Sequence, residues 1–135
     1  MKTLIIIPTL NETKNINNLI NKIFSLFNYN VLVIDDNSSD GTIEKLKLLK
    51  KKYKKLKFLV RKTEKGIGSA HLKGIYYAYY HNYNFCISMD ADGTHDPKEI
   101  KKMLKICSQN KYDIVNTSRF INKNSLSDWP YLRKY

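Results

Sequence analysis

The chain has 135 residues, which is enough for one compact domain and too few for two of ordinary size. Hydrophobic residues make up 42% and charged residues 27%, a balance typical of a folded domain rather than of intrinsic disorder. The two cysteines lie far apart and no apolar run approaches the length of a bilayer span, which excludes a disulfide-stapled scaffold and a transmembrane helix.

The basic charge allows two interpretations. Lys and Arg total 24 against 12 Asp and Glu, giving a net charge of +12, which suits nucleic acid or an anionic membrane surface as a partner. Only three of the basic residues are arginines, however, and many lysines fall in 45–57 at the spacing of a solvated helix face. We therefore favour a solvated surface and expect no nucleic-acid partner. Six of the twelve acidic residues gather at 35–40 and 90–96, which indicates a site.

Nine secondary-structure elements are expected. Short apolar runs rich in β-branched residues predict buried strands, and apolar residues three and four apart predict amphipathic helices. In chain order we expect a strand at 2–8, a helix at 15–27, a strand at 31–34, a helix from a cap at Asp40 to 53, a strand at 57–61, a glycine loop at 65–68, a helix at 69–81, a strand at 84–89, a helix at 97–109 and a strand at 113–117. This alternation predicts an α/β fold with a mostly parallel sheet and helices on both faces.

The clusters of chemically active residues all follow predicted strands. They occupy Pro8–Glu12, Asp35–Thr42, Asp90–Asp96 and Ser118–Arg119. In open parallel sheets, ligands bind in the crevice beyond the carboxyl ends of the strands. The sequence therefore predicts that four clusters converge on one edge of the sheet and form one site there.

Alternating carboxylates follow the fourth predicted strand. Asp90 and Asp92 could hold a hard divalent cation, Mg²⁺ or Mn²⁺, with substrate phosphates completing the coordination shell. Thr94 and His95 could add an oxygen or a nitrogen ligand. The alternative is a solvated turn in which Asp96 caps the next helix.

The second acidic cluster begins with adjacent carboxylates at Asp35 and Asp36. Because such neighbours repel, we expect one to face a ligand or donor and the other to be solvated or to cap a helix. A carboxylate here could accept a hydrogen bond from the ring N–H of uracil or guanine, or from a ribose hydroxyl. The glycines at 66 and 68 lack the spacing of a dinucleotide-binding fingerprint, which therefore is not supported.

Single motifs also suggest other functions. The 33–38 segment is similar to the acidic pocket of response-regulator receivers, but it follows the second strand rather than the first. The 90–94 segment, DADGT, is similar to the nucleophile motif of haloacid-dehalogenase-type phosphatases, which would use Asp90 as nucleophile. A nucleic-acid-binding module that depends on the basic charge is a third alternative. None of these explains the Pro8–Glu12 cluster.

One family accounts for all the clusters together. The segments PTLNE, VIDDNSSDGT, KGIGSAHLKG, MDADGTHDP and DIVNTSRF stand in the order and spacing of family 2 glycosyltransferases. Within that family the chain most resembles polyprenol-phosphate (dolichol-phosphate) mannosyltransferases, from Thr3 to about Arg133. It departs from their usual pattern at Leu10, where tyrosine is common, and at Gly93-Thr94, where leucine followed by serine or glutamine is common.

The resemblance implies a GT-A fold and one nucleotide-sugar-binding domain over residues 1–135. The implied nucleotide-sugar ligands are Pro8, Leu10, Glu12, Ile34, Asp36, Asp90, Ala91, Asp92 and Arg119. Asp92 and Thr94 would reach a Mg²⁺ or Mn²⁺ ion. The implied catalytic residues are Asp90, Asp92 and Arg119. Family members continue beyond the matched region, so we expect the domain to be incomplete at its C-terminus.

The implied reaction transfers a hexose, mannose from GDP-mannose, onto a polyprenyl phosphate; another family 2 reaction with a UDP-sugar is the alternative. A phosphate acceptor is largely dianionic at neutral pH, since its second pKa is about 6, and needs no general base. Arg119 and Arg133 would bind that phosphate through forked hydrogen bonds, although Arg133 beside Lys134 equally fits a surface charge. With a lipid acceptor and a basic surface, we expect a cytoplasmic protein peripheral to the membrane.

Overall fold

The computed structural model describes residues 1–118. The chain divides into two compact units, Met1–Ile100 and Lys101–Tyr135. The first unit contains β1 (Thr3–Thr9), α1 (Ile16–Leu26), β2 (Asn30–Asp35), α2 (Thr42–Lys52), β3 (Leu56–Val60), α3 (Ile67–Tyr80) and β4 (Phe85–Ser88). α4 (Glu99–Asn110) begins at the end of this unit and lies almost entirely in the second.

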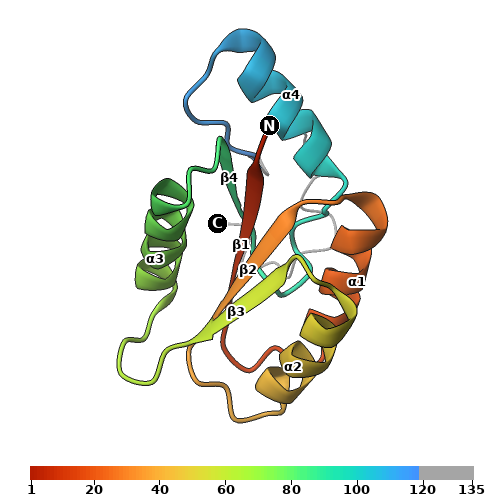
Figure 1. Ribbon diagram of the computed structural model, residues 1–135, viewed down its shortest axis with the longest axis vertical. Helices are drawn as coiled ribbons and strands as arrows, with labels where there is room; N and C mark the ends of the chain where they lie inside the picture. The colour runs from red at the N-terminus through yellow and green to blue at the C-terminus, as the bar shows by residue number, and fades with distance from the viewer. Residues whose placement is uncertain (119–135) are drawn as a thin grey trace, which may run out of the picture. The chain divides into compact units, whose positions relative to one another are not determined.

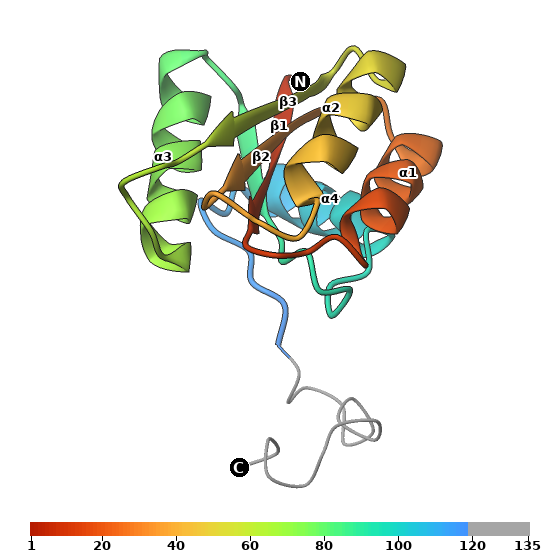
Figure 2. The same ribbon diagram turned by 90° about the horizontal axis from the view of Figure 1, so that it is seen from below.

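The first unit is built on a four-stranded sheet in the order β3-β2-β1-β4, and every neighbouring pair is parallel. β1 pairs with β2 from Leu4 opposite Asn30 to Thr9 opposite Asp35, so the two strands end side by side. Helix α3 covers one face of the sheet, and α1 and α2 cover the other (Figures 1 and 2). This is the predicted α/β arrangement with helices on both faces.

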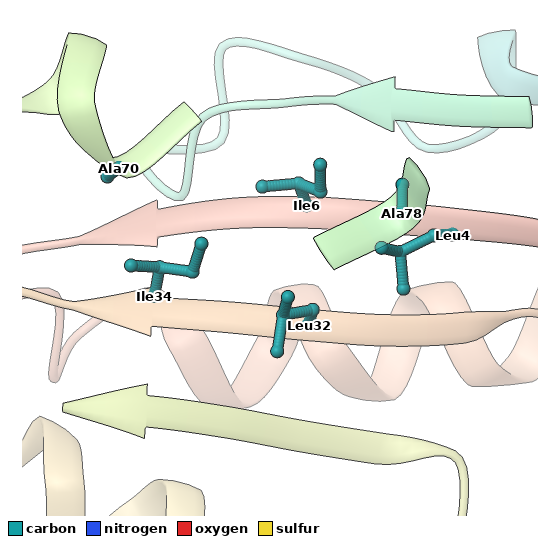
Figure 3. Packing of buried hydrophobic residues seen from close by; sticks show 6 residues of the cluster. All are labelled: Leu4, Ile6, Leu32, Ile34, Ala70 and Ala78. Carbon is teal, nitrogen blue, oxygen red and sulfur yellow. The ribbon is translucent and has the colours of Figure 1, made fainter. Parts of the chain in front are cut away.

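The face of the sheet under α3 is tightly packed. Four side chains alternate along the two central strands and meet two alanines of α3 (Figure 3): Leu4, Ile6, Leu32, Ile34, Ala70 and Ala78. Gly74 lies between those alanines in sequence, and a Cβ atom there would lie 2.5 Å from Cγ2 of Ile6. The small residues of α3 therefore allow the helix backbone to approach β1 closely.

The opposite face is covered by two amphipathic helices. Apolar residues of α1 and α2 are buried at the three- and four-residue spacing seen in the sequence: Ile16, Leu19, Ile20, Ile23, Leu46 and Leu49. Phe24 of α1 stacks on Tyr53 just after α2, with ring centroids 4.3 Å apart. β1 and β2 are thus buried on both faces, as their unbroken apolar runs predicted.

Eight of the nine expected elements are present, and the strand expected at 113–117 is wrong. Residues 111–118 form no strand in the structure. A strand needs a neighbour for its backbone hydrogen bonds, and this run offers only two adjacent apolar residues, of which Ile114 is 79% exposed. None of the helices within residues 1–118 is long and apolar enough to span a membrane.

The cap expected at the start of α2 is displaced by one residue. Gly41, with φ of 95°, occupies the position before the helix, a conformation that glycine adopts without strain. Asp40 still accepts hydrogen bonds from the N–H of Thr42 at 3.0 Å and from its hydroxyl at 2.6 Å. The aspartate therefore binds the first turn of the helix from one position further out.

Candidate functional site

The loop after β1 is held by the loop after β2. Because both strands are parallel and paired, their carboxyl ends place these loops next to each other. Three backbone N–H groups of the first loop donate to side chains of the second: Asn11 to Ser38 at 2.8 Å, Glu12 to Thr42 at 2.9 Å and Thr13 to Asp40 at 2.9 Å. The polar residues at 38–42 thus fix the shape of the Pro8–Glu12 segment.

The adjacent carboxylates at the end of β2 are both buried, so of the two roles expected for the second carboxylate, solvated or capping a helix, the solvated one is wrong. Asp35 accepts hydrogen bonds from the hydroxyl of Thr9 and from both the N–H and the hydroxyl of Ser38, at 2.7–2.8 Å. These bonds satisfy Asp35 within the protein. Asp35 therefore maintains the loop, and Asp36 is left as the residue that faces the site.

Asp36 is paired with a buried arginine that the sequence analysis did not single out. Arg61 donates from Nε to Oδ1 of Asp36 at 2.6 Å, and the N–H of Gly66 donates to Oδ2 at 2.7 Å. The available signal was that Arg61 is the one arginine before position 119 and directly follows β3, the strand beside β2. A buried carboxylate requires such a partner.

A cavity of about 280 Å³ opens where the loops after β1, β2 and β4 meet the start of α3. Its walls combine apolar and acidic groups. The lining residues are Pro8, Thr9, Leu10, Glu12, Asp36, Gly66, Ile67, Asp90, Ala91 and Asp92. Three of the four clusters that were predicted to converge therefore line one cavity, and the fourth, Ser118–Arg119, lies partly outside the described residues.

The acidic loop after β4 is ordered by internal hydrogen bonds. The N–H of Asp90 donates to Nδ1 of His95 at 3.0 Å. Oδ1 of Asp92 accepts from the N–H of Thr94 at 2.9 Å and from its hydroxyl at 2.7 Å. Both aspartates reach the cavity, whereas Thr94 supports Asp92 from outside the cavity wall.

Asp96 behaves as the alternative interpretation expected. Its Oδ1 accepts from the N–H of Lys98 at 3.1 Å and lies 2.9 Å from Nζ of Lys22. The Lys98 hydrogen bond, followed by the contact with Lys22, lowers the pKa of this carboxyl. Asp96 thus stabilises the chain just before α4, and it is not among the residues that line the cavity.

The predicted site residues do not all meet. Seven line the cavity: Pro8, Leu10, Glu12, Asp36, Asp90, Ala91 and Asp92. The side chain of Ile34 lies instead in the core beneath α3 (Figure 3). Arg119 and Arg133 fall outside the described residues. Within residues 1–118 no group of three or more His, Cys, Asp or Glu side chains is arranged to hold a metal ion.

The family model described as Glycosyl transferase family 2 matches residues 4–135. The chain belongs to this family. It is 36% identical to a dolichol-phosphate mannosyltransferase of Pyrococcus furiosus, an alignment that covers 99% of this chain and 38% of the relative. It is 30% identical to a polyprenol monophosphomannose synthase of Mycolicibacterium smegmatis (98% and 50%) and 30% identical to an undecaprenyl-phosphate mannosyltransferase of Micrococcus luteus (99% and 55%).

The chain thus spans between 38% and 55% of the length of these curated relatives. Solved structures of similar fold include a Pyrobaculum calidifontis mannosyltransferase in complex with GDP-Man and Mn²⁺ (TM-score 0.52, 23% identity, covering 57% of this chain and 24% of that one). A Mycobacterium tuberculosis glucosyl-3-phosphoglycerate synthase complex with Mn²⁺ and UDP has a TM-score of 0.63 at 16% identity, covering 80% and 40%. The fold is GT-A, and family membership favours a glycosyltransferase over the phosphatase suggested by DADGT.

Proposed function

We propose that the protein transfers a hexose, mannose from GDP-mannose, onto a polyprenyl phosphate. The observation that carries the proposal is the convergence of Asp36, Asp90 and Asp92 on one cavity at the carboxyl edge of a parallel sheet. The similarity to three polyprenol-phosphate mannosyltransferases over nearly the whole chain supports the lipid acceptor and the sugar.

The nucleoside would occupy the side of the cavity formed by the loop after β1 and by Asp36. Pro8 and Leu10 offer apolar surface, and Leu10 is 54% exposed, so a base could cover it. Asp36 would accept a hydrogen bond from a base ring N–H, which both guanine and uracil possess. Glu12, whose backbone is anchored to Thr42, would contribute a second acceptor for a ribose hydroxyl.

The diphosphate would lie toward Asp90 and Asp92. Their carboxylate oxygens suit Mg²⁺ or Mn²⁺, ions that proteins hold with one or two carboxylates while substrate phosphates fill other positions. The Thr94 hydroxyl, bonded to Asp92, is a further oxygen near this pair. When bound, such an ion neutralises the charge that develops on the departing nucleoside diphosphate. The protein's own part is to orient Asp92 through Thr94 and to fix the Asp90 backbone through His95.

The acceptor would be a phosphate rather than a hydroxyl. A phosphate monoester is largely dianionic near pH 7, because its second pKa is about 6, so the chain need not supply a base to deprotonate it. Arg119 would contact the donor phosphates and the acceptor phosphate, and Arg133 the acceptor phosphate, each through paired N–H donors.

A lipid acceptor requires contact with a membrane surface, and we propose its cytoplasmic face. One face of α3, called here the α3 outer face, supports this by exposing large apolar and aromatic side chains. These are Leu72, Ile75, Tyr76, Tyr79 and Tyr80, with exposed fractions between 49% and 75%. Tyrosine is suited to a membrane–water interface, since its ring is apolar and its hydroxyl remains hydrated.

Calorimetry with GDP and UDP, each with and without Mn²⁺, tests the proposal. We expect Mn²⁺-dependent binding with a preference for GDP, and a loss of roughly tenfold or more in Asp92→Asn. Asp96→Asn is the matched control, because it removes an acid from the same loop without touching the cavity. If nucleotide affinity were the same in excess chelator as with Mn²⁺, the proposed metal ion would be contradicted. If UDP bound more tightly than GDP, the donor would be a UDP-sugar instead of GDP-mannose.

A further inference from the structure

Arg61 is a buried charged residue to which the proposed reaction assigns no role. Only 4% of the residue is exposed, and its guanidinium contacts three other segments. Nε donates to Oδ1 of Asp36 at 2.6 Å, with Nη2 2.5 Å from the same oxygen. Nη1 donates to the hydroxyl of Ser69 at 2.7 Å, and Nη2 donates to the carbonyl of Gly66 at 2.9 Å. A single side chain thus joins the ends of β2 and β3 to the start of α3.

The groups that Arg61 holds are parts of the cavity wall. Asp36 and Gly66 both line the cavity, and the N–H of Gly66 donates to the second oxygen of Asp36 at 2.7 Å. Arg61 is not among the lining residues, so it contacts this wall from behind. Oδ1 of Asp36 is contacted by both Nε and Nη2 of Arg61, whereas Oδ2 accepts the one hydrogen bond from Gly66 and retains capacity for another.

We propose that Arg61 is a positioning residue for the nucleobase. It fixes the rotamer of Asp36 and balances its buried charge, and through Gly66 and Ser69 it holds the loop and the first turn of α3 against the same carboxylate. This inference rests on the proposed function, in which Asp36 accepts a base ring N–H. Guanidinium is suited to the task, because its planar fork binds a carboxylate and a carbonyl at once and remains charged at every accessible pH.

The effect of Arg61 should be specific to the base. The base would bind Asp36, whereas the diphosphate would lie near Asp90 and Asp92 in another part of the cavity. Removing the arginine should therefore weaken the binding of nucleoside diphosphates and leave unchanged the binding of a ligand that has phosphates but no base. A general loss of structure would weaken both kinds of ligand together.

The test is calorimetry in Mn²⁺ of GDP, UDP and inorganic pyrophosphate on the full chain. We expect Arg61→Lys, which keeps a charge but loses the fork, to bind the preferred nucleotide roughly tenfold more weakly. Pyrophosphate affinity should stay within about twofold. Lys62 is the exposed basic neighbour of Arg61, and Lys62→Gln should leave both the nucleotide affinity and the pyrophosphate affinity unchanged. Ser69→Ala removes one Arg61 contact without touching Asp36 and should cost less than Arg61→Lys.

A double-variant comparison separates positioning from bulk stability. Asp36→Asn combined with Arg61→Lys should bind nucleotide no more weakly than Asp36→Asn alone, because both changes act through one carboxylate. Additive losses, an equal loss for pyrophosphate, or unchanged nucleotide binding in Arg61→Lys would each overturn the inference while leaving the proposed function in place. If the unaltered chain binds neither nucleotide with Mn²⁺, the proposed function fails and the inference fails with it.

Discussion

At the scale of single residues, Asp40 makes a testable contribution to stability. Desolvation acts to raise its pKa, but hydrogen bonds from the Thr42 hydroxyl and from the N–H groups of Thr13 and Thr42 outweigh it and lower the pKa below the usual 3.8. A carboxyl with a lowered folded-state pKa stabilises the fold above its unfolded pKa, and this contribution disappears as the pH falls through the folded value.

We therefore expect Asp40→Ala to lower the urea midpoint at pH 7, and expect its difference from the unaltered chain to narrow below about pH 4. Asp40→Asn is the control, because it keeps an acceptor oxygen but cannot titrate. At pH 7 it should lower the urea midpoint less than Asp40→Ala does. A difference that stays constant from pH 7 to pH 3 would show that the charge of Asp40 does not stabilise the fold.

Residue roles at the site were only partly predictable from the sequence. Placing Asp36 and Asp90 at the same edge followed from their position after parallel strands, which is a consequence of topology. The sequence did not predict that Asp35 maintains the loop while Asp36 faces the cavity. Their partners Thr9 and Arg61 lie on or next to other strands. Such pairings depend on side-chain geometry between elements, and neither spacing nor residue type reveals them.

At the scale of elements, the contact between α3 and β1 limits what can replace Gly74. Alanine is a better helix former than glycine by about 1 kcal/mol, but its Cβ would lie 2.5 Å from Cγ2 of Ile6, which is fully buried. Overpacking of this kind costs about 1–3 kcal/mol, and the gain in helix propensity offsets about 1 kcal/mol of it, so we expect Gly74→Ala to lower the free energy of unfolding by up to about 2 kcal/mol.

Gly68→Ala is the matched control on the same helix. Apart from its chain neighbours and the backbone of its own helix, nothing lies within 4 Å of a Cβ placed there, so only the helix propensity changes and stability should rise slightly or stay constant. Urea unfolding of both variants measures the two effects. If Gly74→Ala were as stable as Gly68→Ala, the close packing of α3 on Ile6 would not hold in solution.

Element prediction succeeded where the hydrophobic pattern was long or uninterrupted. The buried run of β1 and the amphipathic α1 were predicted with boundaries displaced by only a residue or so. The strand expected at 113–117 rested on Ile114 and Val115 alone. Two apolar residues do not specify a strand without a neighbour to pair with, and sequence alone does not show whether that neighbour is in reach.

At the scale of the whole molecule, membrane binding would involve two surfaces, one acting through electrostatic attraction and the other through burial of apolar side chains. Each lysine near an anionic bilayer contributes on the order of 1 kcal/mol, and this attraction is screened over a Debye length of about 8 Å at physiological salt. Burial of aromatic and aliphatic surface is insensitive to screening. The basic stretch at 50–57 and the α3 outer face should therefore respond differently to salt.

Sedimentation with vesicles containing anionic lipid, measured across a salt series, separates these contributions. Replacing Tyr76, Tyr79 and Tyr80 with serine should reduce the fraction that remains bound at high salt, because the exposed rings no longer enter the interface. Replacing Lys50, Lys51 and Lys52 with glutamine should mainly reduce binding at low salt, since these exposed lysines end α2 away from the cavity. If the tyrosine variant bound as well as the unaltered chain at every salt concentration, the α3 outer face would have no part in membrane contact. If the unaltered chain failed to pellet with the vesicles even at low salt, peripheral membrane binding itself would be excluded. The residues that carry the net charge of +12 would then only be solvated surface residues.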